Sequence, residues 1–86
     1  MLGGDEKLIA MRVQVDCRKV KAGGSEPRSF VLGTRRLWVL RVLERHANTL
    51  SRHFTVSIAD GRRFELRQDI ATGEWWLARV IPAALT

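Results

Sequence analysis

Two histidines flank a short polar segment, and the serine between them raises the question of nucleophilic catalysis. His46 and His53 are seven positions apart, with Ser51 between them. A histidine can activate a serine by taking its proton, but the serine must stand on a rigid, sharply turned backbone. Ser51 lies in a polar connection that shows no such turn. The pattern therefore favours two surface histidines at a turn, and we predict no catalytic residues and no enzyme activity.

A single cysteine limits the metal and redox chemistry. One cysteine cannot form an intramolecular disulfide, and with two histidines it cannot complete a four-ligand zinc site. Cys17 continues an alternation of apolar residues and is expected in the core, where a free cysteine acts as a small hydrophobic residue. We expect no metal, no cofactor and no small-molecule substrate.

Basic side chains exceed acidic ones by 15 to 9, which gives a formal net charge of +6. Such an excess is typical either of a solvated surface or of a surface that binds polyanions. Arg63 and Arg67 are expected on one face of a strand, opposite to Phe64 and Leu66, although Glu65 shares their face. The nucleic-acid-binding hypothesis rests on these arginines, on a tryptophan beside them and on two arginines at a neighbouring turn: Arg35, Arg36, Arg63, Arg67 and Trp76.

The elements that must position these residues are two β-hairpins in residues 53–80. Phe54, Val56 and Ile58 alternate with smaller residues, which is the period of a half-buried strand. A two-residue turn at Asp60 and Gly61 would bury charges against this face. A three-residue loop, residues 59–61, instead places Val56 opposite Phe64 and Phe54 opposite Leu66, so we predict the three-residue loop.

The second turn, over residues 69–73, leaves the two neighbouring tryptophans undecided. A loop of even length places Leu77 opposite Leu66 and Trp75 beside Gln68 on the core face, so that Trp76 faces outward. A loop of odd length exchanges Trp75 and Trp76. The sequence does not distinguish these alternatives, because a tryptophan occupies both positions.

The remaining segments extend the same pattern. Alternation over residues 11–17 predicts a strand that brings Val13 and Val15 to the core, and residues 28–32 predict a short one. Residues 37–47 favour a strand with a bulge near Leu40 and Arg41, and a short helix is the alternative. We predict an all-β, mainly antiparallel meander of five or six strands in a small SH3-like barrel or open sandwich.

The domain organisation follows from composition. Residues 1–10 are expected to be a disordered N-terminal extension, residues 11–80 a single β domain, and residues 81–86 a C-terminal tail. No apolar run approaches the ~20 residues needed to cross a bilayer, and the first residues lack the order of a secretory signal. We expect a cytoplasmic protein without membrane contact.

Several motifs resemble a family of small uncharacterised bacterial domains with the same order of elements. They are Pro27-Arg-Ser-Phe-Val-Leu-Gly33, Val39-Leu-Arg-Val-Leu-Glu-Arg45, Asp60-Gly-Arg-x-Phe-x-Leu66 and Ala71-Thr-Gly-Glu-Trp-Trp-Leu77. The resemblance covers about residues 11–80 and departs at His46, where the family has an aromatic residue. Some members are associated with proteins related to error-prone DNA polymerases, which implies a DNA-associated accessory role. The motifs consist of turn and core residues, so they specify fold better than function.

These observations lead to two hypotheses about function. The first is a small, basic, non-enzymatic module that binds nucleic acid as an accessory protein. The alternative is a protein–protein interaction or self-association domain that uses an edge strand and an exposed tryptophan.

Overall fold

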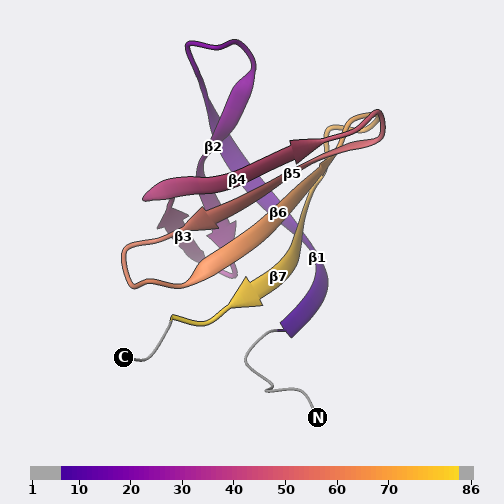
Figure 1. Ribbon diagram of the computed structural model, residues 1–86. Helices are drawn as coiled ribbons and strands as arrows, with labels where there is room; N and C mark the ends of the chain where they lie inside the picture. Colours follow the sequence, from indigo (N-terminus) through magenta and orange to yellow (C-terminus); the bar gives the residue numbers. More distant parts are fainter. Residues whose placement is uncertain (1–6, 84–86) are drawn as a thin grey trace.

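The chain folds into seven β-strands in the computed structural model, which describes residues 7–83 (Figure 1). The strands are β1 (Lys7–Lys19), β2 (Ser25–Leu32), β3 (Arg35–Trp38), β4 (Arg41–Ala47), β5 (Ser51–Ser57), β6 (Arg63–Asp69) and β7 (Trp75–Ile81). Most of the predicted extension 1–10 and half of the predicted tail 81–86 lie outside the described residues. Residues 7–83 contain no helix, and so none that could span a membrane.

The seven strands form one antiparallel sheet in the order β3-β2-β1-β7-β6-β5-β4, curled into a half-barrel. The long strand β1 makes this possible, because its residues 7–13 pair with β7 and its residues 14–19 pair with β2. One end of the sheet is therefore a five-strand layer of β1, β7, β6, β5 and β4. The other is a three-strand layer of β1, β2 and β3, and β3 lies behind β5 in Figure 1.

The all-β antiparallel class is confirmed, but the predicted number of strands is too low and the alternative of a short helix over 37–47 is wrong. This segment is two strands joined at a corner. The Val39 N–H donates to the Arg28 carbonyl in β2, and the Leu40 N–H donates to the Ser57 carbonyl in β5. Consecutive residues thus bond to opposite ends of the sheet, which splits one predicted strand into β3 and β4.

The predicted bulge in this region is displaced. The register of β4 against β5 shifts between Val42 and Glu44, at Leu43, and not near Leu40 and Arg41. Val39 and Val42 pack against the core, whereas Trp38 is exposed. The corner turns the chain between Trp38 and Arg41, so no bulge is required there.

The register of the first hairpin agrees with the buried-face argument, and the structure decides between the two alternatives for the second. Val56 pairs with Phe64 and Phe54 with Leu66, across a turn in which the Gly61 N–H donates to the Ile58 carbonyl. Gly61 has a φ of 92°, which is the left-handed conformation that a three-residue loop requires. In the second hairpin Leu66 pairs with Leu77, so the loop of even length is the correct alternative.

The core lies between the two layers. The rings of Phe30 in β2 and Phe64 in β6 meet edge to face, with centroids 5.0 Å apart. Val13 and Val15 pack against this cluster as predicted, together with Cys17. The buried hydrophobic residues are Phe30, Phe54, Val56, Ile58, Phe64, Leu66, Trp75 and Leu77. Because these side chains face inward, the alternate positions of the same strands form the outer surface.

Candidate nucleic-acid interface

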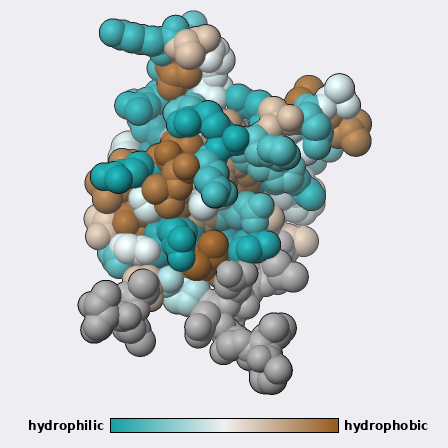
Figure 2. Space-filling model, viewed as in Figure 1, coloured by the Kyte–Doolittle hydropathy of each residue, from teal (hydrophilic) through white to brown (hydrophobic). Residues whose placement is uncertain are grey.

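The outer face of the five-strand layer carries polar and charged side chains. In β6 the buried residues Phe64 and Leu66 alternate with the exposed Arg63 and Arg67, as the period of a strand dictates. Strands β4–β7 lie in front in Figure 1, and Figure 2 shows this side of the molecule as mostly hydrophilic, with smaller hydrophobic areas between. A binding site on this face must therefore be formed by outer side chains that are neighbours across adjacent strands.

Five outer side chains form a row that crosses all five strands. Register places Arg12 of β1 opposite Trp76 of β7, and Trp76 opposite Arg67 of β6. Arg67 is in turn opposite His53 of β5, and His53 is opposite His46 of β4. We call this row, Arg12-Trp76-Arg67-His53-His46, the cross-strand band. With strands ~4.8 Å apart, its four steps span ~19 Å.

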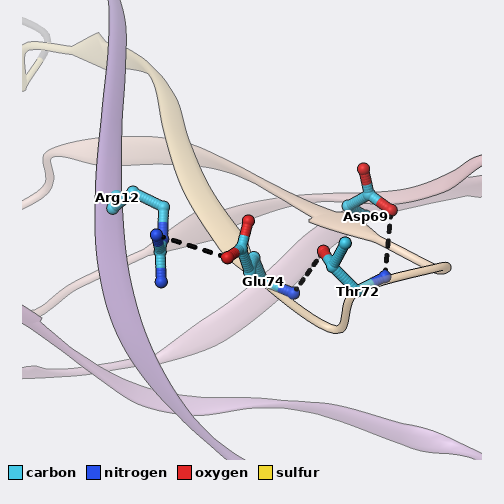
Figure 3. A network of polar contacts seen from close by, with 4 residues as sticks. All are labelled: Arg12, Asp69, Thr72 and Glu74. Carbon is cyan, nitrogen blue, oxygen red and sulfur yellow. Dashed lines mark hydrogen bonds and ion pairs between the residues drawn. The ribbon is translucent and has the colours of Figure 1, made fainter.

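One end of the band is held by a carboxylate (Figure 3). The Arg12 guanidinium lies over the Trp76 ring, 5.7 Å from its centroid, and Arg12 Nη1 is 3.3 Å from Glu74 Oε2. The Glu74 N–H donates to Thr72 Oγ1, and the Thr72 N–H donates to Asp69 Oδ1. The β6–β7 turn therefore holds Glu74 beside Arg12, and Arg12 beside the indole.

The middle of the band provides an uncompensated cation. Arg67 is exposed and makes no ion pair with any residue in the described part of the chain. Its neighbour Glu65 on the same face is 3.3 Å from Arg79, so that carboxylate is already paired. A guanidinium without a carboxylate partner is available to an external anion.

The other end of the band contains the two histidines. The rings of His46 and His53 are 6.1 Å apart between centroids, at an interplanar angle of 63°. His53 Nε2 is 2.9 Å from Ser51 Oγ, two residues earlier on the same strand face. Within residues 7–83 no carboxylate hydrogen-bonds to either ring, so a third group that would orient the base is lacking.

The structure brings together only some of the residues of the sequence hypothesis. Arg67 and Trp76 are cross-strand neighbours, and Arg63 shares their face four residues from Arg67 along β6, beyond Glu65. Arg35 and Arg36 lie in β3, four places from β6 in the sheet, and Arg36 Nη1 donates to Ser29 Oγ at 2.8 Å. Arg35 and Arg36 therefore belong to the other layer.

Sequence reasoning missed three members of the band. Alternation places Arg12 on the wet face of the first strand, but that pattern does not show that β1 pairs with β7. His46 and His53 were interpreted as residues flanking a turn, which is correct, since they pair directly across β4 and β5. The hairpin pattern in the sequence indicated that the two histidines lie close together. It did not indicate that this hairpin lies beside Arg67, because that depends on the pairing of β5 with β6.

A cavity of about 260 Å³ lies between the β1–β2 turn and the strands β4 and β5, and His46 of the band is also part of its lining. Arg52 lines it, but Nε and Nη2 of Arg52 donate to Gln68 Oε1, and Nη1 donates to the Ser25 carbonyl. The Gly23 N–H donates to the Val20 carbonyl within the turn. These donors are used to close the fold, so the cavity is a weaker candidate for anion binding than the band.

No family model, no curated protein and no solved structure matches the chain. Among the described residues no three His, Cys, Asp or Glu side chains are grouped as metal ligands.

Proposed function

We propose that this chain is a small non-enzymatic accessory module that binds single-stranded nucleic acid through the cross-strand band. The observation that carries the proposal is the register-aligned row of two arginines, one indole and two imidazoles on the outer face. Guanidinium groups contact phosphates, while aromatic rings and guanidinium planes offer surfaces on which unpaired bases stack.

Single strands suit this surface better than a duplex. Bases within a duplex have no free face, whereas those of a single strand can stack on Trp76, on the Arg12 guanidinium above it, or on the imidazoles. A row of ~19 Å corresponds to a short binding site, at the lower end of the ~4–16 nucleotides per small barrel that such proteins cover. Recognition by stacking and phosphate contacts is tolerant of sequence.

Self-association through the edge strand β4 is the weaker alternative, because this edge is poorly suited to pair with a second copy. If β4 of a second copy pairs antiparallel with β4 and continues the sheet, outer-face residues of one copy must lie opposite outer-face residues of the other. The two central registers then place Glu44 opposite Glu44 or Arg45 opposite Arg45, and directly opposed like charges destabilise a sheet. The bulge at Leu43 also disrupts this edge.

The test is binding of a dye-labelled ~12-nucleotide oligothymidylate, followed by fluorescence anisotropy across a salt series. We expect wild-type binding to weaken steeply with salt. Arg67→Ala should lower the slope of log K against log salt by ~0.7, the value for one phosphate contact on a single strand. Trp76→Ala should weaken binding by ~1–3 kcal/mol.

Arg18→Ala is the matched control, because it removes one positive charge from an exposed position outside the band. It should leave the salt slope of the wild type nearly unchanged. Absence of wild-type binding at ~50 mM salt, where attraction between charges is still strong, would reject the proposal. An equal loss in Arg18→Ala and Arg67→Ala would assign the binding to net charge instead of the band.

A further inference from the structure

The arrangement of carboxylate, guanidinium and indole in the band occurs a second time in the three-strand layer. Arg28 Nε donates to Asp16 Oδ2 at 3.0 Å, and Arg28 Nη2 forms an ion pair with the same oxygen at 2.7 Å. The same guanidinium lies over the Trp38 ring, 5.8 Å from its centroid. The corresponding distance from Arg12 to the Trp76 centroid is 5.7 Å. A carboxylate thus holds an arginine over an indole on both layers.

The two indoles point away from each other. Leu37 and Phe30 are cross-strand neighbours that face the core, so the next residue, Trp38, is on the outer face of its layer. Trp75 and Leu77 face the core on either side of Trp76. Because Phe30 and Phe64 meet between the layers, the outer faces of the two layers are on opposite sides of the molecule.

Trp38 and its neighbours provide the groups that a base-stacking site requires, namely an exposed ring and nearby cations. Trp38 is 58% exposed, more than any other Phe or Trp side chain in residues 7–83. Arg36 lies on the same face and donates to Ser29 Oγ, and Ser29 is the cross-strand partner of Trp38. Asp16 is paired with Arg28, so the second cation, Arg36, has no carboxylate partner in the described residues.

We propose that Arg28, Arg36 and Trp38, which we call the Trp38 surface, form a second site for single-stranded nucleic acid. This inference rests on the proposed function of the cross-strand band. One chain then holds two single-stranded segments on opposite faces and bridges them. On a long strand both sites are occupied by one molecule, and the second contact is made at a high effective concentration.

The direct test is the stoichiometry of a ~6-nucleotide oligothymidylate, too short to reach both faces, measured by native mass spectrometry and calorimetry. We expect two oligonucleotides per wild-type chain and one in either Trp38→Ala or Trp76→Ala. The double variant should bind none. Arg36→Ala should weaken the second site at least severalfold, and Trp38→Phe should restore part of the binding lost in Trp38→Ala.

Bridging is measured with two oligonucleotides that carry a donor and an acceptor dye. Wild-type protein should bring them together and produce energy transfer, which either single tryptophan variant should abolish. Leu40→Ala is the matched control: Leu40 is 67% exposed at the adjacent corner, and a protein partner would use it with Trp38 whereas a nucleic acid would not. Leu40→Ala should therefore retain two bound oligonucleotides.

The outcomes separate the two proposals. One oligonucleotide per wild-type chain, lost in Trp76→Ala and unaffected in Trp38→Ala, overturns the second site and leaves the band in place. If the wild-type chain binds one oligonucleotide, and this is lost in Trp38→Ala but not in Trp76→Ala, both binding at the cross-strand band and bridging are overturned. Equal losses in Leu40→Ala and Trp38→Ala overturn the nucleic-acid assignment of the Trp38 surface in favour of an apolar contact. Far-UV circular dichroism confirms that each variant is folded.

Discussion

Trp75 is 7% exposed and packs against Phe54 with ring centroids 5.8 Å apart, whereas Trp38 is 58% exposed. Trp76 lies between these extremes, half-buried beneath the Arg12 guanidinium. The same side chain therefore stabilises the core in one position and is accessible to solvent in the others. The strand register decides which, because consecutive residues point to opposite faces.

Phe64 is the residue whose removal should cost most. It is fully buried and meets Phe30 edge to face. Phe64→Ala should lower the free energy of unfolding by ~3–5 kcal/mol, because it deletes a ring from the packed interior. Urea denaturation measures this loss. Leu40→Ala, at an exposed position, should change stability by no more than ~0.5 kcal/mol, and an equal effect of both variants would contradict the assigned core.

Cys17 should react slowly in the folded protein. Burial raises the pKa of its thiol, and this effect exceeds the opposing influences of the Arg52 charge and the Ser25 hydrogen bond. Since the thiolate is the reactive form, alkylation by iodoacetamide near neutral pH should be slow in the folded state and much faster in urea. Mass spectrometry of samples quenched over time measures both rates. Equal rates would show that the thiol is not protected.

The β5–β6 hairpin shows how an element is determined locally. Asp60 Oδ1 accepts the Arg62 N–H and Asp60 Oδ2 accepts Arg62 Nε, at 2.9 and 2.8 Å. Gly61 supplies the left-handed residue, and a Cβ there would be 3.2 Å from the Ala83 Cβ. Turn chemistry and the alternating apolar residues specify the same register, so this element was predictable in detail.

The Asp60 carboxylate makes the stability of this hairpin depend on pH. The backbone N–H of Arg62, and then its guanidinium, lower the pKa of Asp60 below its usual value. A carboxylate with a lowered pKa stabilises the folded state above the unfolded value, ~3.9, and this contribution disappears as the pH falls through the folded value.

Asp60→Asn should therefore melt at a lower temperature than wild type at neutral pH, and the difference should shrink as the pH falls below ~3.9. Thermal denaturation at a series of pH values measures it. A difference between the two melting temperatures that stays constant down to pH ~2 would show that the carboxylate charge does not contribute.

At the scale of the whole molecule, the half-barrel is closed by different contacts at its two ends. At the β3–β4 corner the backbone bonds to both β2 and β5. At the other end side chains bridge the layers: Arg52 of β5 reaches the Ser25 carbonyl, and Arg45 of β4 is 2.5 Å from Glu26. The Arg52 guanidinium also lies over Phe54, 5.2 Å from its centroid.

Arg52→Ala should lower the free energy of unfolding by ~1–3 kcal/mol, because it leaves partly buried acceptors of Gln68 and Ser25 without their donor. Arg52→Lys should not restore the stability, since one ammonium cannot replace the planar group that binds both acceptors. Urea denaturation measures both variants. Arg41→Ala, which removes an exposed arginine, is the control, and a fully stable Arg52→Lys would contradict the bridging geometry.

The sequence by itself determined the features that depend on near neighbours in the chain. Alternation over residues 54–58 predicted which side chains are buried, and Gly61 together with the buried face predicted the pairing of Val56 with Phe64. The same local argument placed Arg63 and Arg67 on the outer face. Period and turn chemistry act within a hairpin, where the chain itself supplies both partners.

The tertiary structure alone decided which residues are neighbours when their strands are distant in the chain. It separated Arg35 and Arg36 from Arg67, joined Arg12 to Trp76, and turned Trp38 outward. The physical reason is that β1 bonds to β7 and to β2 with its two halves, and that the corner after Trp38 bonds to both ends of the sheet. Pairing between segments distant in the chain depends on closing one shared core, and no local period encodes that closure.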